Sequence, residues 1–129
     1  MASFVSYLNE CVFCSESHAA VADVHWGEQG SAKKIWLNVN EASPRLQAFL
    51  RIAKQVQKSG RSVQTQDIEL ARRQGATDAD IHDCVLIAAA FCLYNRYVDG
   101  LATLTPPQGD KSYAGIGQML AEKGYVNSI

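Results

Sequence analysis

The sequence predicts an all-α protein, a bundle of about five to six helices forming a single domain over residues 1–129. Apolar residues recur at spacings of three and four in most segments, which is the period of an amphipathic helix. Helix-capping residues precede several of these segments, as in Ser43-Pro44 and Thr77-Asp78-Ala79-Asp80. No segment alternates apolar and polar residues as a strand would, and no internal repeat is present.

The first third of the chain is predicted to hold two helices and a connection. Residues 2–8 carry Phe4, Val5 and Leu8 at helical spacing. Asn9 is a predicted N-cap for a helix that starts near Glu10 and ends at Gly27. Residues 27–41 have weak periodicity, and we expect a connection there with one short helix over 32–37.

The remaining helices are predicted from their caps. Ser43 and Pro44 open a helix that stops at Ser59-Gly60, and its expected buried face follows the helical period. Thr65 is expected to cap a short helix over 66–74, with Gly75 at its end. Thr77 opens the longest helix, from residue 78 to about 102, which we expect to be packed on all sides between Val85 and Leu93. A last helix over 112–123 should turn three residues inward, namely Ile116, Met119 and Leu120.

Composition excludes several classes of function. The net charge is −1 and 19% of the residues are charged, so no nucleic-acid surface is indicated. The longest run without a charged residue has 12 residues, Cys84 to Asn95, which is too short to cross a bilayer. The N-terminus lacks the pattern of a secretory signal. Four cysteines would suit two disulfides, but Cys11 and Cys14 have the spacing of a catalytic or metal-binding pair, and Cys84 and Cys92 lie in an apolar helical run. A reducing, cytoplasmic location is therefore expected.

The chemistry of this sequence centres on a C-x-x-C-x-x-x-H run formed by Cys11, Cys14 and His18. On a helix, residues three and four apart share a face, which would bring the three side chains together. A helix N-terminus favours a thiolate, a second cysteine can trap a sulfenic acid as a disulfide, and a histidine can move protons. The run therefore predicts a redox site.

Two alternatives remain open for this run. The cysteines could be packing residues, as we expect for Cys84 and Cys92 in their apolar helix. The run could instead contribute to a structural zinc site, because thiolates and imidazoles are zinc ligands. A closed zinc site needs a fourth ligand, for which the candidates are His25, His82 and Cys84.

The segment from Tyr7 to Ala22, which contains the run, resembles the alkyl hydroperoxidase D-like family of the carboxymuconolactone decarboxylase superfamily, and in particular its peroxidase-related branch. The stretch from Phe91 to Leu101 is similar to the N-R-x-x-D-x-L pattern of that branch. The helix starts at Ser43 and Thr77 match as well. The resemblance covers most of residues 4–107.

This resemblance implies an all-helical fold that assembles into homo-oligomers (dimers, trimers or hexamers) and reduces hydroperoxides without a bound cofactor or metal. It implies that Cys14 is the peroxidatic cysteine, Cys11 the proton donor and resolving cysteine, and His18 part of the proton relay. A reduced protein or a small thiol would recycle the disulfide. Muconolactone decarboxylation is disfavoured, because that branch typically lacks the paired cysteines.

Two departures from the family pattern bear on activity. The relay glutamate of the family would fall before Met1, and Glu10 and Glu16 are not its equivalents. The histidine that often precedes the second cysteine is replaced by Phe13. A member that only oligomerises, or that exchanges thiols weakly, is the resulting alternative. Asn95 and Asp99 are expected to belong to a structural hydrogen-bond network rather than to contact substrate.

Overall fold

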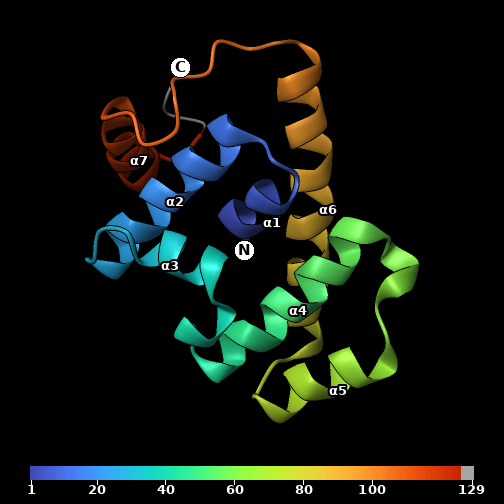
Figure 1. The fold of residues 1–129 in the computed structure, drawn as a ribbon. Coiled ribbons are helices and arrows are strands. Elements are labelled where there is room, and N and C mark those ends of the chain that lie inside the picture. Colours follow the sequence, from blue (N-terminus) through green and yellow to red (C-terminus); the bar gives the residue numbers. More distant parts are fainter. Residues whose placement is uncertain (126–129) are drawn as a thin grey trace.

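A computed structural model of the protein describes residues 1–125, and Figure 1 shows that it is built of helices. No strand occurs within this range, so the predicted all-α class is confirmed. Residues 1–125 form seven α-helices, slightly more than the expected five to six. They are α1 (Ala2–Leu8), α2 (Val12–Trp26), α3 (Ser31–Leu37), α4 (Pro44–Lys58), α5 (Thr65–Arg73), α6 (Asp78–Gly100) and α7 (Ser112–Lys123), with 3₁₀ turns at Val39–Glu41 and Gly60–Ser62.

Local sequence signals set most of the helix ends. The Ser43 hydroxyl accepts a hydrogen bond from the Leu46 N–H at the start of α4. At the start of α6, Thr77 and Asp80 form the predicted capping box. Gly27 ends α2 with a φ of 69°, a conformation that costs glycine little. These predictions are confirmed because each depends on neighbours only three or four residues away.

The predicted start of α5 was one residue late. Gln64, rather than Thr65, precedes the first helical turn, and the Asp67 carboxylate accepts the Gln64 backbone N–H at 2.9 Å. The Arg51 side chain from α4 also donates to this buried carboxylate. Asp67 is held by a tertiary contact as well as by the local box, which explains why Thr65 does not serve as the cap.

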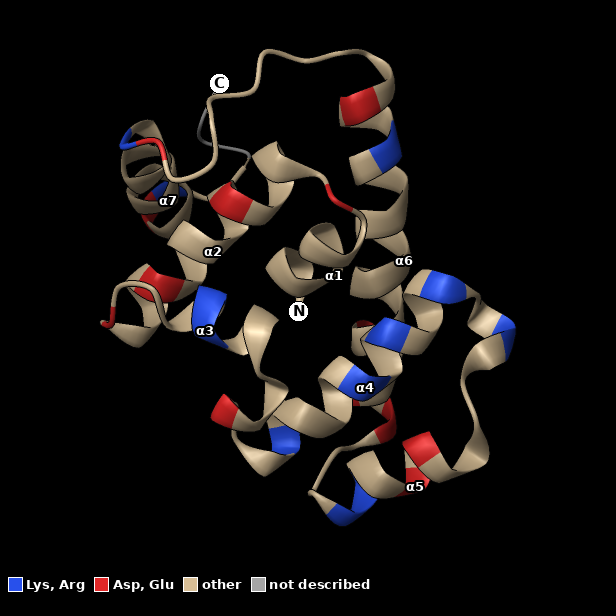
Figure 2. Ribbon diagram, in the orientation of Figure 1, with Lys and Arg blue, Asp and Glu red and all other residues tan. Residues whose placement is uncertain are grey.

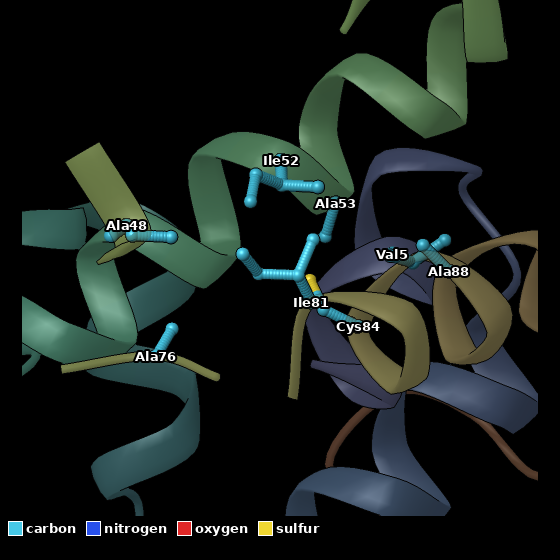
Figure 3. Close-up of a cluster of buried hydrophobic side chains, with 9 residues drawn as sticks. Val5, Ala48, Ile52, Ala53, Ala76, Ile81, Cys84 and Ala88 are labelled. Atoms are coloured by element: carbon cyan, nitrogen blue, oxygen red, sulfur yellow. The ribbon is translucent and has the colours of Figure 1, made fainter. Parts of the chain in front are cut away.

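The short helix α1 lies at the centre of the fold, enclosed by α2, α4 and α6 (Figure 1). One buried cluster joins α1 to α4, α5 and α6 and includes Val5, Ile52 and Cys84 (Figure 3). A second cluster joins α1 to α3 and α4 and includes Phe4, Trp36 and Leu50. Both faces of α1 are therefore used for packing, and the residues that follow it are held firmly in place.

Helix α7 packs closely against α2. A Cβ added to Gly117 would lie 2.5 Å from the Ala20 Cβ, so only glycine fits at this crossing. Tyr113 is the other buried residue of α7, whereas Met119 is exposed. The prediction that Met119 points inward was wrong, because α7 packs through the face that carries Gly117 and Tyr113.

The prediction that α6 is packed on all sides was also wrong. Leu86 is 56% exposed and Leu93 is 61% exposed, and Tyr97 and Leu101 continue the exposed stripe. The middle of α6 carries no charged residue, as Figure 2 shows. The helix is apolar around its circumference, but neighbouring elements cover only one side of it.

No helix within residues 1–125 is both long enough and apolar enough to span a membrane.

Candidate functional site

The two cysteines of the C-x-x-C run lie where α1 turns into α2. Helix α2 begins at Val12, with Cys11 as its N-cap residue and Cys14 in its first turn. The prediction that Asn9 caps a helix starting near Glu10 was wrong. Asn9 instead ends α1, and Glu10 adopts a left-handed conformation with a φ of 60° that reverses the chain into Cys11. The Cys11 N–H donates to the Ser6 carbonyl at 3.0 Å, which fixes Cys11 against α1.

Both thiols are free and buried, with Cys11 0% exposed and Cys14 4% exposed. Burial is the main cause that raises the pKa of the Cys11 thiol to about 12, and the Cys14 and Asp99 side chains act in the same direction. The Cys14 backbone N–H acts in the opposite direction. Cys11 is therefore a protonated thiol at neutral pH, in direct contact with Cys14.

His18 lies one turn after Cys14 on α2. Its Nδ1 lies 2.8 Å from the Cys14 carbonyl oxygen, and its Nε2 contacts the Tyr125 hydroxyl. A carbonyl can only accept, so Nδ1 carries the proton and Nε2 of the neutral ring accepts from Tyr125. The ring packs edge-on against Phe91 with centroids 4.7 Å apart. Burial lowers the pKa of His18, which keeps the imidazole neutral.

Phe13 of α2 and Tyr113 of α7 pack against each other near the thiols. Their ring centroids are 6.4 Å apart, and the Tyr113 hydroxyl donates to the Pro106 carbonyl at 2.7 Å. Burial raises the pKa of Tyr113, and so do the nearby charges of Glu16 and Asp110. Phe13 stands where many members of the resembling family have histidine. It is one partner of this aromatic pair.

A polar network links the α1–α2 junction to α6. The Asn9 amide donates to Asn95 at 2.8 Å, and the Asn95 amide donates to the Ser6 hydroxyl at 2.9 Å. Gln57 from α4 donates to Asn9 at 2.9 Å. Asn95 is fully buried, so these bonds satisfy polar groups that would otherwise destabilise the fold. The expected structural role of Asn95 is consistent with these contacts.

Asp99 was predicted to share a structural network with Asn95. Its side chain is exposed, and it is one of the groups that raise the pKa of the Cys11 thiol, after burial and the Cys14 side chain. The signal in the sequence was the spacing of four residues between Asn95 and Asp99, which puts both on the same face of α6. Only the packing of α6 against α1 reveals which residue this face meets.

Glu16 is the buried carboxylate nearest in sequence to the thiols, yet it serves another contact. It accepts from the Lys33 ammonium at 2.6 Å and from the Gly109 N–H at 3.2 Å. These bonds tie α2 to α3 and to the connection before α7. Its side chain lies on a different face of α2 from that of Cys14, as the sequence predicted.

The candidate fourth zinc ligands lie apart from the thiols. Cys84 belongs to the core cluster between α4 and α6, His82 is exposed, and His25 is exposed at the end of α2. Within residues 1–125, no three His, Cys, Asp or Glu side chains come together as ligands for a metal ion. The arrangement at Cys11 and Cys14 is suited to thiol–disulfide chemistry.

Comparison with known proteins supports the fold. The chain is similar in structure to an uncharacterized peroxidase-related protein from Silicibacter sp. TM1040, with a TM-score of 0.76 and 24% sequence identity. The match covers 88% of this chain and 59% of that chain. No family model matches the sequence, and no protein with a curated description matches it. The predicted all-helical fold is confirmed within residues 1–125, and it is shared with that peroxidase-related protein.

Proposed function

We propose that this protein is a thiol-dependent hydroperoxide reductase that works through Cys11 and Cys14. The observation that carries the proposal is the contact between two free thiols at the start of α2. The similarity in fold to a peroxidase-related protein supports it. Four free cysteines also suit a reducing compartment such as the cytoplasm.

In the proposed reaction Cys14 is the nucleophile. It lies in the first turn of α2, where N–H groups without helical partners favour an anion. The Cys14 thiolate attacks the outer oxygen of a hydroperoxide, the O–O bond breaks, and Cys14 becomes a sulfenic acid. The departing alkoxide takes a proton from the surrounding groups, and one alcohol is released.

Cys11 then resolves the sulfenic acid. Its sulfur attacks the Cys14 sulfur, a disulfide forms, and water leaves. A protein thiol or a small thiol reduces the disulfide by exchange and completes the cycle. His18 assists proton movement near Cys14, because its neutral ring presents Nε2 as an acceptor, with Tyr125 as the connecting hydroxyl.

The direct test is a coupled peroxidase assay with a dithiol reductant on the wild type and a Cys14→Ser variant. We expect the variant to lose activity by several orders of magnitude, since the nucleophile is removed. Cys84→Ala serves as the matched control, because it also removes a buried thiol but lies in the core. Full activity in Cys14→Ser would exclude this function.

We also propose that the protein self-associates through the exposed apolar stripe of α6, formed by Leu86, Leu93, Tyr97 and Leu101. The stripe is apolar and the middle of α6 carries no charge. The same stripe on a second copy of the chain would therefore match it. Sedimentation velocity should show an oligomer for the wild type and a smaller species for Leu93→Glu. Leu37→Glu, at another exposed leucine, should leave the oligomer intact.

A further inference from the structure

We propose that a pocket between α4 and α5 binds a small monocarboxylate with an alkyl chain of medium length. The pocket has a volume of about 380 Å³, which lies within the usual range for small-molecule sites. Neither cysteine of the redox pair lines it, so the inference does not depend on the proposed function. This α4–α5 pocket is lined by residues that include Phe4, Gln47, Leu50, Arg51, Lys54 and Leu70.

The apolar lining of the α4–α5 pocket comes from well-packed parts of the fold. Phe4 of α1 is 5% exposed and Leu50 of α4 is 2% exposed, and both belong to the same buried cluster. Leu70 lines the pocket from α5 and packs against the other cluster. An alkyl chain in the pocket would leave water for this apolar surface, which favours binding.

The charged residues that line the pocket are both cationic. Arg51 and Lys54 are three residues apart on α4, and Gln47 lies four residues before Arg51. The three side chains therefore follow one face of the helix, and Figure 2 shows the cations along α4. No Asp or Glu is among the lining residues. An anion in the pocket would meet two cations and no charge of its own sign.

The position of Arg51 is set by a buried carboxylate. Its Nε donates to Asp67, which is 1% exposed and also accepts the Gln64 N–H at 2.9 Å. Within residues 1–125 Arg51 makes no other hydrogen bond, and its side chain is 50% exposed, so its terminal N–H groups are open to a ligand. A guanidinium held in this way suits the planar oxygens of a carboxylate.

The balance of charge favours a ligand with a single negative charge. Asp67 already offsets the charge of Arg51. Lys54 is exposed and forms no ion pair within residues 1–125, so it is the uncompensated cation of the lining. A monocarboxylate would match Lys54 with its head group and cover Phe4 and Leu70 with its chain. Medium-chain fatty acids are ligands of this class.

Equilibrium dialysis with radiolabelled octanoate tests the inference. We expect saturable binding of one octanoate per wild-type chain, with a dissociation constant on the order of 1 mM at low salt. Lys54→Met removes the uncompensated charge at an exposed position and should weaken binding about tenfold. Lys58→Met is the matched control, because Lys58 is also exposed on α4 but does not line the pocket. Absence of saturable binding, or equal affinities of the two variants, would overturn the proposal.

Two competition series test the two ends of the ligand separately. From hexanoate to octanoate, the affinity should rise about threefold for each methylene, because each one removes further apolar surface from water. Octylamine has the same chain as octanoate with the opposite charge, so it should not displace the label. Affinities that do not depend on chain length, or displacement by octylamine as effective as that by unlabelled octanoate, would contradict a carboxylate site.

A last variant separates this pocket from the exposed apolar stripe of α6, to which an alkyl chain could also adsorb. Leu93→Glu changes that stripe, in which Leu93 is 61% exposed, and should leave octanoate binding as it is in the wild type. If Leu93→Glu abolishes binding while Lys54→Met retains it, octanoate binds to the stripe and the proposed site is wrong.

Discussion

The four cysteines form two groups that differ in their neighbours, although Cys11, Cys14 and Cys84 are all buried and Cys92 is half-buried. Cys11 and Cys14 lie close together at the start of α2. Cys84 lies within the core between α4 and α6 (Figure 3). Its thiol donates to the Phe49 carbonyl at 3.3 Å. Cys92, on the same helix, contacts the Asn9 amide through its sulfur at 3.7 Å. Eight residues along a helix separate Cys84 from Cys92 by about 12 Å, too far for a disulfide.

This comparison shows that a raised pKa does not identify the reactive thiol. Burial raises the pKa of Cys84 to about 11, and burial is also the main cause of the raised pKa of Cys11. What differs is the set of neighbours. Cys11 has a second sulfur close to it, whereas Cys84 has a backbone carbonyl and apolar side chains. The neighbours, and not burial, decide what each thiol can do.

The largest expected difference is in oxidation. One equivalent of hydrogen peroxide should remove two of the four free thiols and link Cys11 to Cys14, as peptide mapping would show. Cys84 should react with iodoacetamide only after unfolding, because it is fully buried. Cys84→Ala should keep its peroxidase activity and lose about 1 kcal/mol of stability, the cost of one buried heavy atom. A disulfide that includes Cys84 would contradict the comparison.

A smaller effect is expected at the turn that presents Cys11. Glu10 has a φ of 60° and is exposed, so its side chain gains little from this strained conformation. Glu10→Gly should stabilise the protein by about 0.5–1 kcal/mol in urea unfolding, the relief of strain less the added freedom of the unfolded chain. Glu69→Gly, within α5, should destabilise it by about 1 kcal/mol. Destabilisation by Glu10→Gly would show that Glu10 has a role beyond the turn.

The smallest expected effect is a pH dependence of stability caused by His18. Burial lowers the pKa of His18 below its ordinary value of 6.5, so the unfolded chain binds a proton more readily than the folded chain. Its contribution to stability is present above about pH 6.5 and is lost as the pH falls toward the folded-state pKa. His18→Gln should remove this component from urea midpoints measured between about pH 8 and about pH 5. His82→Gln, at an exposed histidine, should retain it.

The sequence alone predicted most helices, because their signals are local. Ser43-Pro44, Thr77 with Asp80, and Gly27 each act within one turn, and α4, α6 and the end of α2 fall where these residues place them. The starts of α2 and α5 were misplaced for a local reason too. Cys11 and Gln64 are uncommon N-cap residues, while Asn9 and Thr65 beside them are favoured ones.

The amino-acid sequence by itself determined the helical class, the spacing of Cys11 and Cys14, and the position of His18 one turn later. Only the tertiary structure decided that α6 leaves one apolar side exposed, that Asn95 meets Asn9, and that Tyr125 meets His18. Asn95 and Tyr125 lie far from these partners in the sequence, and no helical period predicts such contacts. They depend on how α6 and α7 pack around α1 and α2, which is set by the whole core.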